Sequence, residues 1–113
     1  MNEIIVNGEV YIKKQSDLDL IYAMVRTEKA GVFAGYIDSY EPNNVINLKN
    51  ARRIWYWDGA ASLSQLAMDG TSKPDECKFP CEVDAIKLFG VIEVIPMTDK
   101  AKKSIASVNV WAQ

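Results

Sequence analysis

The part of the sequence with the most chemical potential is RRIWYW, residues 52–57, where two arginines and three aromatic rings occupy six positions. Arginine can donate two parallel hydrogen bonds to phosphate oxygens, and a nucleobase stacked on an aromatic ring gains about 1–3 kcal/mol. On a regular strand, Arg53, Trp55 and Trp57 project to the same side. The pattern predicts a surface for a flat, anionic ligand, unless a bulge near Asn50 changes which side chains share that face.

The same residue types also have structural explanations. Tryptophans in a strand are typical of a core or a subunit interface. Arg26 lies in an apolar stretch, where an unpaired guanidinium is costly to bury, so either a carboxylate neutralises it or an anionic ligand reaches it. Residues 28–36, EKAGVFAGY, contain two glycines but lead into a strand and match no nucleotide fingerprint. They predict a tight turn rather than a phosphate loop.

Catalytic chemistry is restricted by the absence of histidine. The common serine and cysteine hydrolase arrangements need an imidazole base, and many metal sites need imidazole ligands. Glu82 and Asp84 would share one face of a strand and are the remaining acid–base candidates, although such a pair is typical of a solvated edge. Cys77 and Cys81 are spaced for neither a redox pair nor a zinc site and are interpreted as reduced thiols. We therefore expect a protein that is not an enzyme and has no cofactor and no metal.

The composition is that of one globular domain over residues 1–113. Apolar residues make up 49% and charged residues 25% of the chain, and the net charge is −2. A negative chain has no general attraction for long nucleic acid. No apolar run is long enough to span a bilayer, and no export signal is visible, so we expect no membrane association and a cytosolic location.

Apolar patterning predicts the elements that must position these residues. A hairpin is expected in residues 4–14 around Asn7-Gly8. A central strand in residues 18–27 and further strands in residues 32–40 and 45–57 would form an antiparallel meander. Residues 81–97 predict one or two more strands, interrupted at Gly90.

Two short helices complete the prediction. Asp58 is expected to cap a helix over residues 59–69 that stops at Gly70, and Thr98 or Asp99 to cap a helix in residues 99–108. Small residues on the first helix permit close approach of the sheet or of a second subunit. The predicted fold class is α+β, with an antiparallel β-sheet core and two short helices, in an oligomeric protein.

Three segments carry a family resemblance: MVRTEKAGVFAGYI, LKNARRIWYWDGAASLSQLAMDG and KFPCEVDAIKLFGVIEVIPMTDKAKKSI. In this order they resemble a family of phage proteins, the Thoeris anti-defence sponges of the first described type, over about four-fifths of the chain. The resemblance implies a small β-sheet protein with helices that assembles as a homodimer or a higher homo-oligomer.

The resemblance also implies a function. Members bind cyclic ADP-ribose isomers made by Thoeris TIR proteins without cleaving them, and some also bind cyclic di- or trinucleotides of the CBASS system. It implies ligand sites between subunits and action in the cytoplasm of the infected bacterial host. The ligand-binding residues carried over are Arg26, Phe33, Arg53, Trp55 and Trp57, with Asn50 and Leu66 as weaker members. A nucleotide hydrolase using Glu82 and Asp84 and a protein-interaction module are the alternatives.

Overall fold

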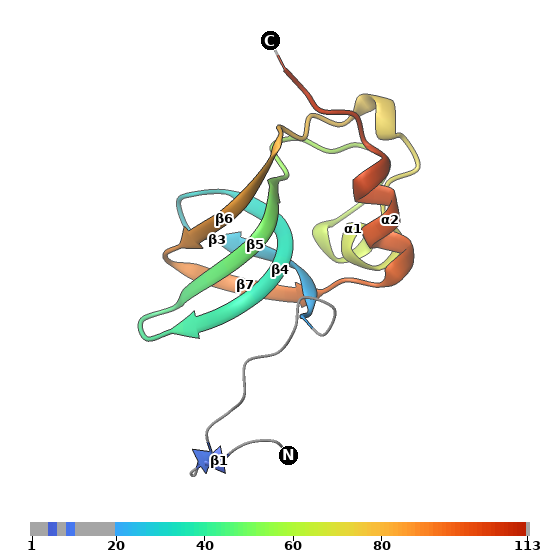
Figure 1. Cartoon of the computed structure of the whole chain (residues 1–113). Coiled ribbons are helices and arrows are strands. Elements are labelled where there is room, and N and C mark those ends of the chain that lie inside the picture. Colours follow the sequence, from blue (N-terminus) through green and yellow to red (C-terminus); the bar gives the residue numbers. More distant parts are fainter. Residues whose placement is uncertain (1–4, 7–8, 11–19, 113) are drawn as a thin grey trace.

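The structure is a computed structural model that describes residues 5–6, 9–10 and 20–112 (Figure 1). Strands β1 (Ile5–Val6) and β2 (Glu9–Val10) pair antiparallel, which confirms the predicted N-terminal hairpin. The Asn7-Gly8 turn of that hairpin, and residues 18–19 of the strand predicted to follow, lie outside the described residues.

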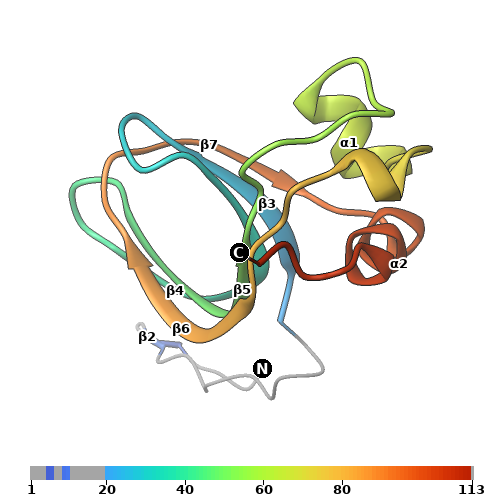
Figure 2. The ribbon, with the colours of Figure 1, turned by 90° about the horizontal axis from the view of Figure 1, so that it is seen from above.

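The main sheet has five antiparallel strands in the order β6-β5-β4-β3-β7. Their bounds are β3 Tyr22–Thr27, β4 Val32–Glu41, β5 Val45–Arg53, β6 Glu82–Leu88 and β7 Val91–Pro96. The meander and the break at Gly90 are confirmed, and β3 pairs on both sides, as a central strand should. The sheet curls strongly (Figure 2), so that the outer strands β6 and β7 are linked by only Phe89 and Gly90.

Curling separates the apolar side chains into two cores. The inner core, inside the curl, consists of Ala23, Val25, Phe33, Ile37, Ile46, Leu48, Ala51 and Leu88. The helix-side core, between the sheet and the helices, consists of Met24, Ala34, Ile54, Leu66, Ala67, Cys77, Phe79, Ile105 and Val108. Strand β3 contributes alternately to both, which explains why its sequence is apolar on both faces.

A bulge in β5 decides which side chains face each core. Lys49 lies opposite Tyr36 and Arg52 opposite Ala34, so β5 has one residue more than β4 between these pairs. Asn50 takes the positive φ of 50° that such a bulge requires, a conformation that asparagine tolerates better than most residues. The extra residue directs Arg52 to the helix side, away from Leu48, whereas an unbulged strand would place both on one face.

Strand β5 also ends earlier than predicted. It stops at Arg53, not at residue 57, because Ile54 N donates to Val32 O at the first residue of β4, and β4 has no residue left to pair with the next position. Beyond it, Tyr56 forms only an isolated bridge with Lys78. The prediction that Arg53, Trp55 and Trp57 project to the same side of one regular strand is therefore wrong.

The first helix, α1 (Leu63–Asp69), is shorter than predicted. Its N-cap is Ser62, whose hydroxyl accepts from Gln65 N at 3.1 Å, and not Asp58. The Asp58 carboxylate instead accepts from Gly59 N at 2.7 Å, and Gly59 adopts a φ of 83° that a helix cannot contain. The predicted stop at Gly70 is confirmed, since its N–H donates to the carbonyl of Leu66.

The second helix, α2 (Asp99–Ser107), begins as predicted after Thr98, whose hydroxyl accepts from Ala101 N at 3.1 Å. A short 3-10 helix, η2 (Pro74–Glu76), lies between α1 and β6. Neither these helices nor any other in the described part of the chain is long and apolar enough to cross a membrane.

Arg52 joins these layers. Its side chain is only 7% exposed, and its guanidinium donates to the carbonyls of Pro80, Ile105 and Phe79 at 3.0, 2.9 and 3.2 Å. Burial lowers the pKa of Arg52, but guanidinium remains charged at any ordinary pH. One charge thus stabilises the sheet, the segment before β6 and the C-terminal end of α2 together.

Replacing Arg52 by methionine should destabilise the fold more than the same replacement of an exposed arginine does. Hydrogen bonds to a charged group contribute about 1.5–3 kcal/mol each, and relief of desolvation offsets part of their loss, so we expect the free energy of unfolding to fall by about 2–4 kcal/mol. Urea denaturation followed by tryptophan fluorescence measures this. Arg26→Met, at an exposed ion pair, is the control and should cost less than about 1 kcal/mol; equal losses would contradict the assignment.

Burial of Tyr22 predicts a loss of stability at alkaline pH. Burial, then the charges of Glu82 and Tyr36, raise its pKa from 10.0 to about 12. Because the folded state retains a proton that the unfolded chain loses, this contribution is complete below pH 10 and disappears as the pH rises to 12, a change of roughly 2–3 kcal/mol. Denaturant unfolding across this window should show a shallower fall for Tyr22→Phe, and parallel curves for the two proteins would refute the prediction.

Candidate ligand-binding site

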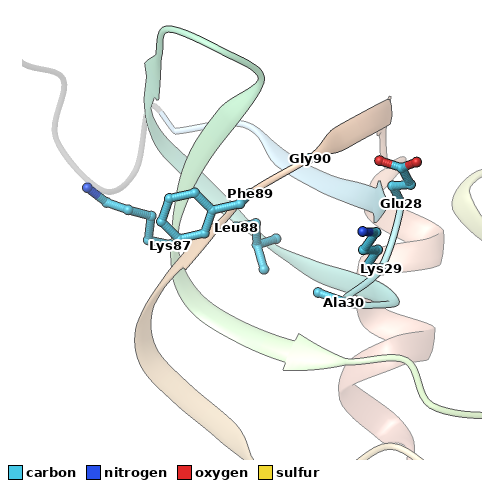
Figure 3. Close-up of a pocket in the computed structure, with 7 residues that line it drawn as sticks. All are labelled: Glu28, Lys29, Ala30, Lys87, Leu88, Phe89 and Gly90. Atoms are coloured by element: carbon cyan, nitrogen blue, oxygen red, sulfur yellow. The ribbon is translucent and has the colours of Figure 1, made fainter.

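A pocket of about 380 Å³ opens at one end of the curled sheet, where the β3–β4 turn meets the link between β6 and β7. Glu28, Lys29 and Ala30 line it from the turn, and Lys87, Leu88, Phe89 and Gly90 line it from the link (Figure 3). Glu28 N donates to Gly90 O at 2.9 Å and ties the two segments together. The pocket is therefore formed by residues far apart in the sequence.

The turn that forms one wall is held by Thr27, which is 5% exposed. The Thr27 hydroxyl donates to Gly31 O at 2.9 Å and accepts from Ala30 N at 2.8 Å, while the Thr27 N–H also donates to Gly31 O. Gly31 closes the turn with a φ of 99°, a conformation that favours glycine. The predicted tight turn is confirmed, and its hydrogen bonds fix the position of Lys29.

Two lysines, the carboxylate of Glu28 and one aromatic ring give the pocket its chemical character. Phe89 is 64% exposed and offers a ring at the mouth, above the buried Leu88. Lys87 forms a 2.9 Å ion pair with Glu41, whose pKa is lowered by hydrogen bonds from Asn47 and Lys87. Within residues 20–112, Lys29 has no ion-pair partner. The lining suits a ligand with a flat apolar part and a negative charge.

Arg53 lies beside this pocket, on the far side of the turn. Its Nη1 donates to Ala30 O at 2.6 Å, and its guanidinium carbon lies 4.4 Å from the centre of the Phe33 ring. Phe33 is 2% exposed and belongs to the inner core. Of the residues carried over from the family resemblance, Arg53 and Phe33 are thus brought together, with Phe33 supporting the arginine from below.

Trp55 belongs to a different surface. Its ring stacks on that of Trp111 with centres 5.0 Å apart and planes at 9°, and Lys78 Nζ lies 5.7 Å from the centre of each ring. Trp55 is 58% exposed. The stack forms where the residues after β5 lie next to the C-terminal segment, which is held by a hydrogen bond from Trp111 N to Phe79 O at 3.0 Å.

The other predicted ligand residues are distributed over the fold. Trp57 packs half-buried against the helix-side core, and Leu66 is fully buried within it. Asn50 is exposed in the bulge. Arg26 is exposed rather than buried, and its Nε forms a 2.8 Å ion pair with Glu93 of β7, so the carboxylate alternative for Arg26 is the one observed.

The acidic pair and the cysteines lie elsewhere. Glu82 and Asp84 are exposed on the outer strand β6, and no group of three or more possible metal ligands occurs among the described residues. Both cysteines are free thiols, with Cys77 buried and Cys81 exposed. Cys77 is part of the helix-side core.

Sequence reasoning missed the lysines and the phenylalanine of the pocket. The sequence pattern around Phe89-Gly90 predicts only a break between strands, and the pattern around Lys29 predicts only a turn. Phe89 could have been identified as an exposed aromatic residue from the sequence. It lies beside a glycine in a link of only two residues, and so short a link gives its ring few neighbours to pack against. Nothing local indicates that Lys29 lies across from it.

Inorganic pyrophosphate should bind this pocket weakly. In an NMR titration, we expect the largest amide shifts in residues 28–31 and 87–90. Lys29→Gln should weaken binding about two- to fivefold, as for loss of one exposed charge, and added salt should weaken it further. Lys73→Gln, an exposed lysine on the segment before η2, is the matched control. Shifts centred elsewhere, or equal effects of the two variants, would contradict the site.

Comparison with known proteins finds a family model that matches most of the chain. Residues 20–105 match the family described as a domain of unknown function, DUF6948. This range contains the whole sheet and the pocket and leaves out the N-terminal hairpin and Trp111. No curated protein and no solved structure matches the chain. Because the match covers most of its length, the chain belongs to the DUF6948 family.

Proposed function

We propose that this protein binds and sequesters a cyclic ADP-ribose isomer without cleaving it. This is the function implied by the resemblance to phage Thoeris anti-defence sponges, and it would act in the cytoplasm of the infected bacterial host. The observation that carries the proposal is the pocket of about 380 Å³ lined by Lys29, Lys87 and Phe89, with Arg53 beside it. A cyclic ADP-ribose presents an adenine face and a pyrophosphate, which complement a ring and a group of cations.

The proposal assigns a role to each of these groups. Lys29 and Arg53 bind the pyrophosphate, and Lys87 adds charge at the other end of the pocket. Phe89 packs on adenine. Phe33 orients Arg53 from the core and does not itself reach the ligand, because its side chain is 2% exposed. Arg26 could contact the phosphate only if its ion pair with Glu93 were broken and the ligand took the place of that carboxylate.

A second copy of the chain is part of the proposal. A sponge must outcompete a receptor, which requires nanomolar affinity, about −12 kcal/mol. A ligand in an open pocket remains largely hydrated, so an enclosing partner is needed for such affinity. Phe89 is 64% exposed in the single chain, and Trp55 is 58% exposed. We propose that a homodimer or a higher homo-oligomer covers these rings and encloses the ligand.

The test is calorimetry of the purified protein with two glyco-cyclic ADP-ribose isomers, followed by chromatography of the ligand released by heat denaturation. We expect binding of one isomer at about one ligand per chain and recovery of intact nucleotide. Cyclic di- and trinucleotides are titrated in parallel, since the family resemblance implies separate sites for them. Recovery of a hydrolysed product, or absence of binding to either isomer, would overturn the proposal.

Two variants connect binding to the pocket. Lys29→Gln removes a cation and Phe89→Ala removes the exposed ring, and each should weaken binding by about 1–3 kcal/mol, or roughly 5- to 150-fold. Met68→Ala is the control for Phe89→Ala, because Met68 is also an exposed large apolar residue, at 42%, but lies on α1 and outside the pocket lining. Binding unchanged in both pocket variants would place the ligand elsewhere on the protein.

A further inference from the structure

A second recess, separate from the pocket described above, lies between β3, β4 and the first turns of α2. Its volume is about 280 Å³. The lining residues are Leu20, Ile21, Tyr22, Tyr36, Met97, Asp99 and Lys102. No lining residue is shared with the pocket of Lys29 and Phe89. The two sites therefore can be altered independently.

Lys102 is the charged group at the centre of this recess. Its Nζ lies 4.6 Å from the centre of the Tyr36 ring and 5.5 Å from that of Tyr22. The two tyrosines are direct partners across β3 and β4, with rings edge to face at 5.0 Å. This aromatic corner holds the ammonium in place by attraction to the ring faces, at a half-buried position.

The ammonium of Lys102 has no acceptor in the described part of the chain. No carboxylate of residues 20–112 lies at ion-pair distance from it, and its Nζ donates no hydrogen bond there. Ring faces attract a cation but do not accept three hydrogen bonds. Tyr22 adds no negative charge, since burial raises its pKa to about 12 and keeps the phenol neutral. The recess thus places a half-buried ammonium, with no direct carboxylate contact in residues 20–112, next to two aromatic rings.

The remaining lining narrows the class of ligand. Leu20, Ile21 and Met97 provide apolar walls suited to a small hydrocarbon or aromatic body. Asp99, one helical turn before Lys102, places a negative charge at the same recess. That carboxylate repels a dianion more strongly than a monoanion, so a carboxylate is a better match than a phosphate.

We propose that this recess binds a small carboxylic acid with an apolar body, with Lys102 as the partner of its carboxylate. The rings of Tyr22 and Tyr36 and the apolar walls enclose the body of the ligand. Asp99 sets the preference for one negative charge over two. This site does not depend on the proposed nucleotide site, and each can fail without the other.

The experiment uses the full chain and three probes of similar shape: benzoate, phenyl phosphate and benzyl alcohol. In NMR titrations we expect benzoate to bind with a Kd of roughly 1 mM, with shifts centred on residues 20–22, 36 and 97–102. Phenyl phosphate should bind more weakly and benzyl alcohol not measurably. Equal binding of benzoate and benzyl alcohol would overturn the proposal, because it would show that charge plays no part.

Three variants make the test specific. Lys102→Gln should weaken benzoate binding about tenfold, and Lys102→Arg should restore part of it, as expected for a charge-assisted contact. Lys100→Gln, on the same helix with a side chain 74% exposed, is the matched control and should leave binding unchanged. Asp99→Asn should narrow the preference for benzoate over phenyl phosphate. Unchanged benzoate binding in Lys102→Gln, or equal losses in the Lys100 and Lys102 variants, would refute the assignment.

Discussion

The buried guanidinium of Arg52 is the interaction on which the arrangement of this protein depends. Three backbone carbonyls from two separate segments accept hydrogen bonds from it. The carbonyls of Phe79 and Ile105 also accept from backbone N–H groups, so Arg52 connects the two segments through acceptors that already belong to the local backbone structure. Its place on the helix side depends on the bulge at Asn50, which changes the direction of every later side chain in β5. One residue inserted in a strand therefore determines how the helices and the C-terminal segment attach to the sheet.

The curl of the sheet determines where ligands can reach it. Strong curling of the sheet (Figure 2) fills its inside with apolar side chains, and the two recesses described above lie at one end of the sheet and against α2. One opening has Lys29 at its wall and the other has Lys102. In a chain of net charge −2, each recess contains a carboxylate as well as a lysine: Glu28 with Lys29 in the first and Asp99 with Lys102 in the second.

The residues of the RRIWYW motif are adjacent in the sequence but lie at different places in the tertiary structure. Arg52 becomes a structural donor, Arg53 lies on Phe33 beside the pocket, and Trp55 stacks on Trp111 at another surface. The motif is thus not one ligand surface in the single chain. Its exposed members are still consistent with the proposed sponge, in which a second copy of the chain would enclose the ligand.

The sequence by itself determined what depends on near neighbours: the α+β class, the strand break at Gly90, the helix stop at Gly70 and the cap at Thr98. These follow from backbone conformation and hydrogen bonds within a few residues. Only the tertiary structure decided the end of β5, the partners of Arg52 and the meeting of Lys29 with Phe89 across a pocket. Those outcomes depend on which strand lies opposite and how far the sheet curls, and both arise from contacts between segments distant in the chain.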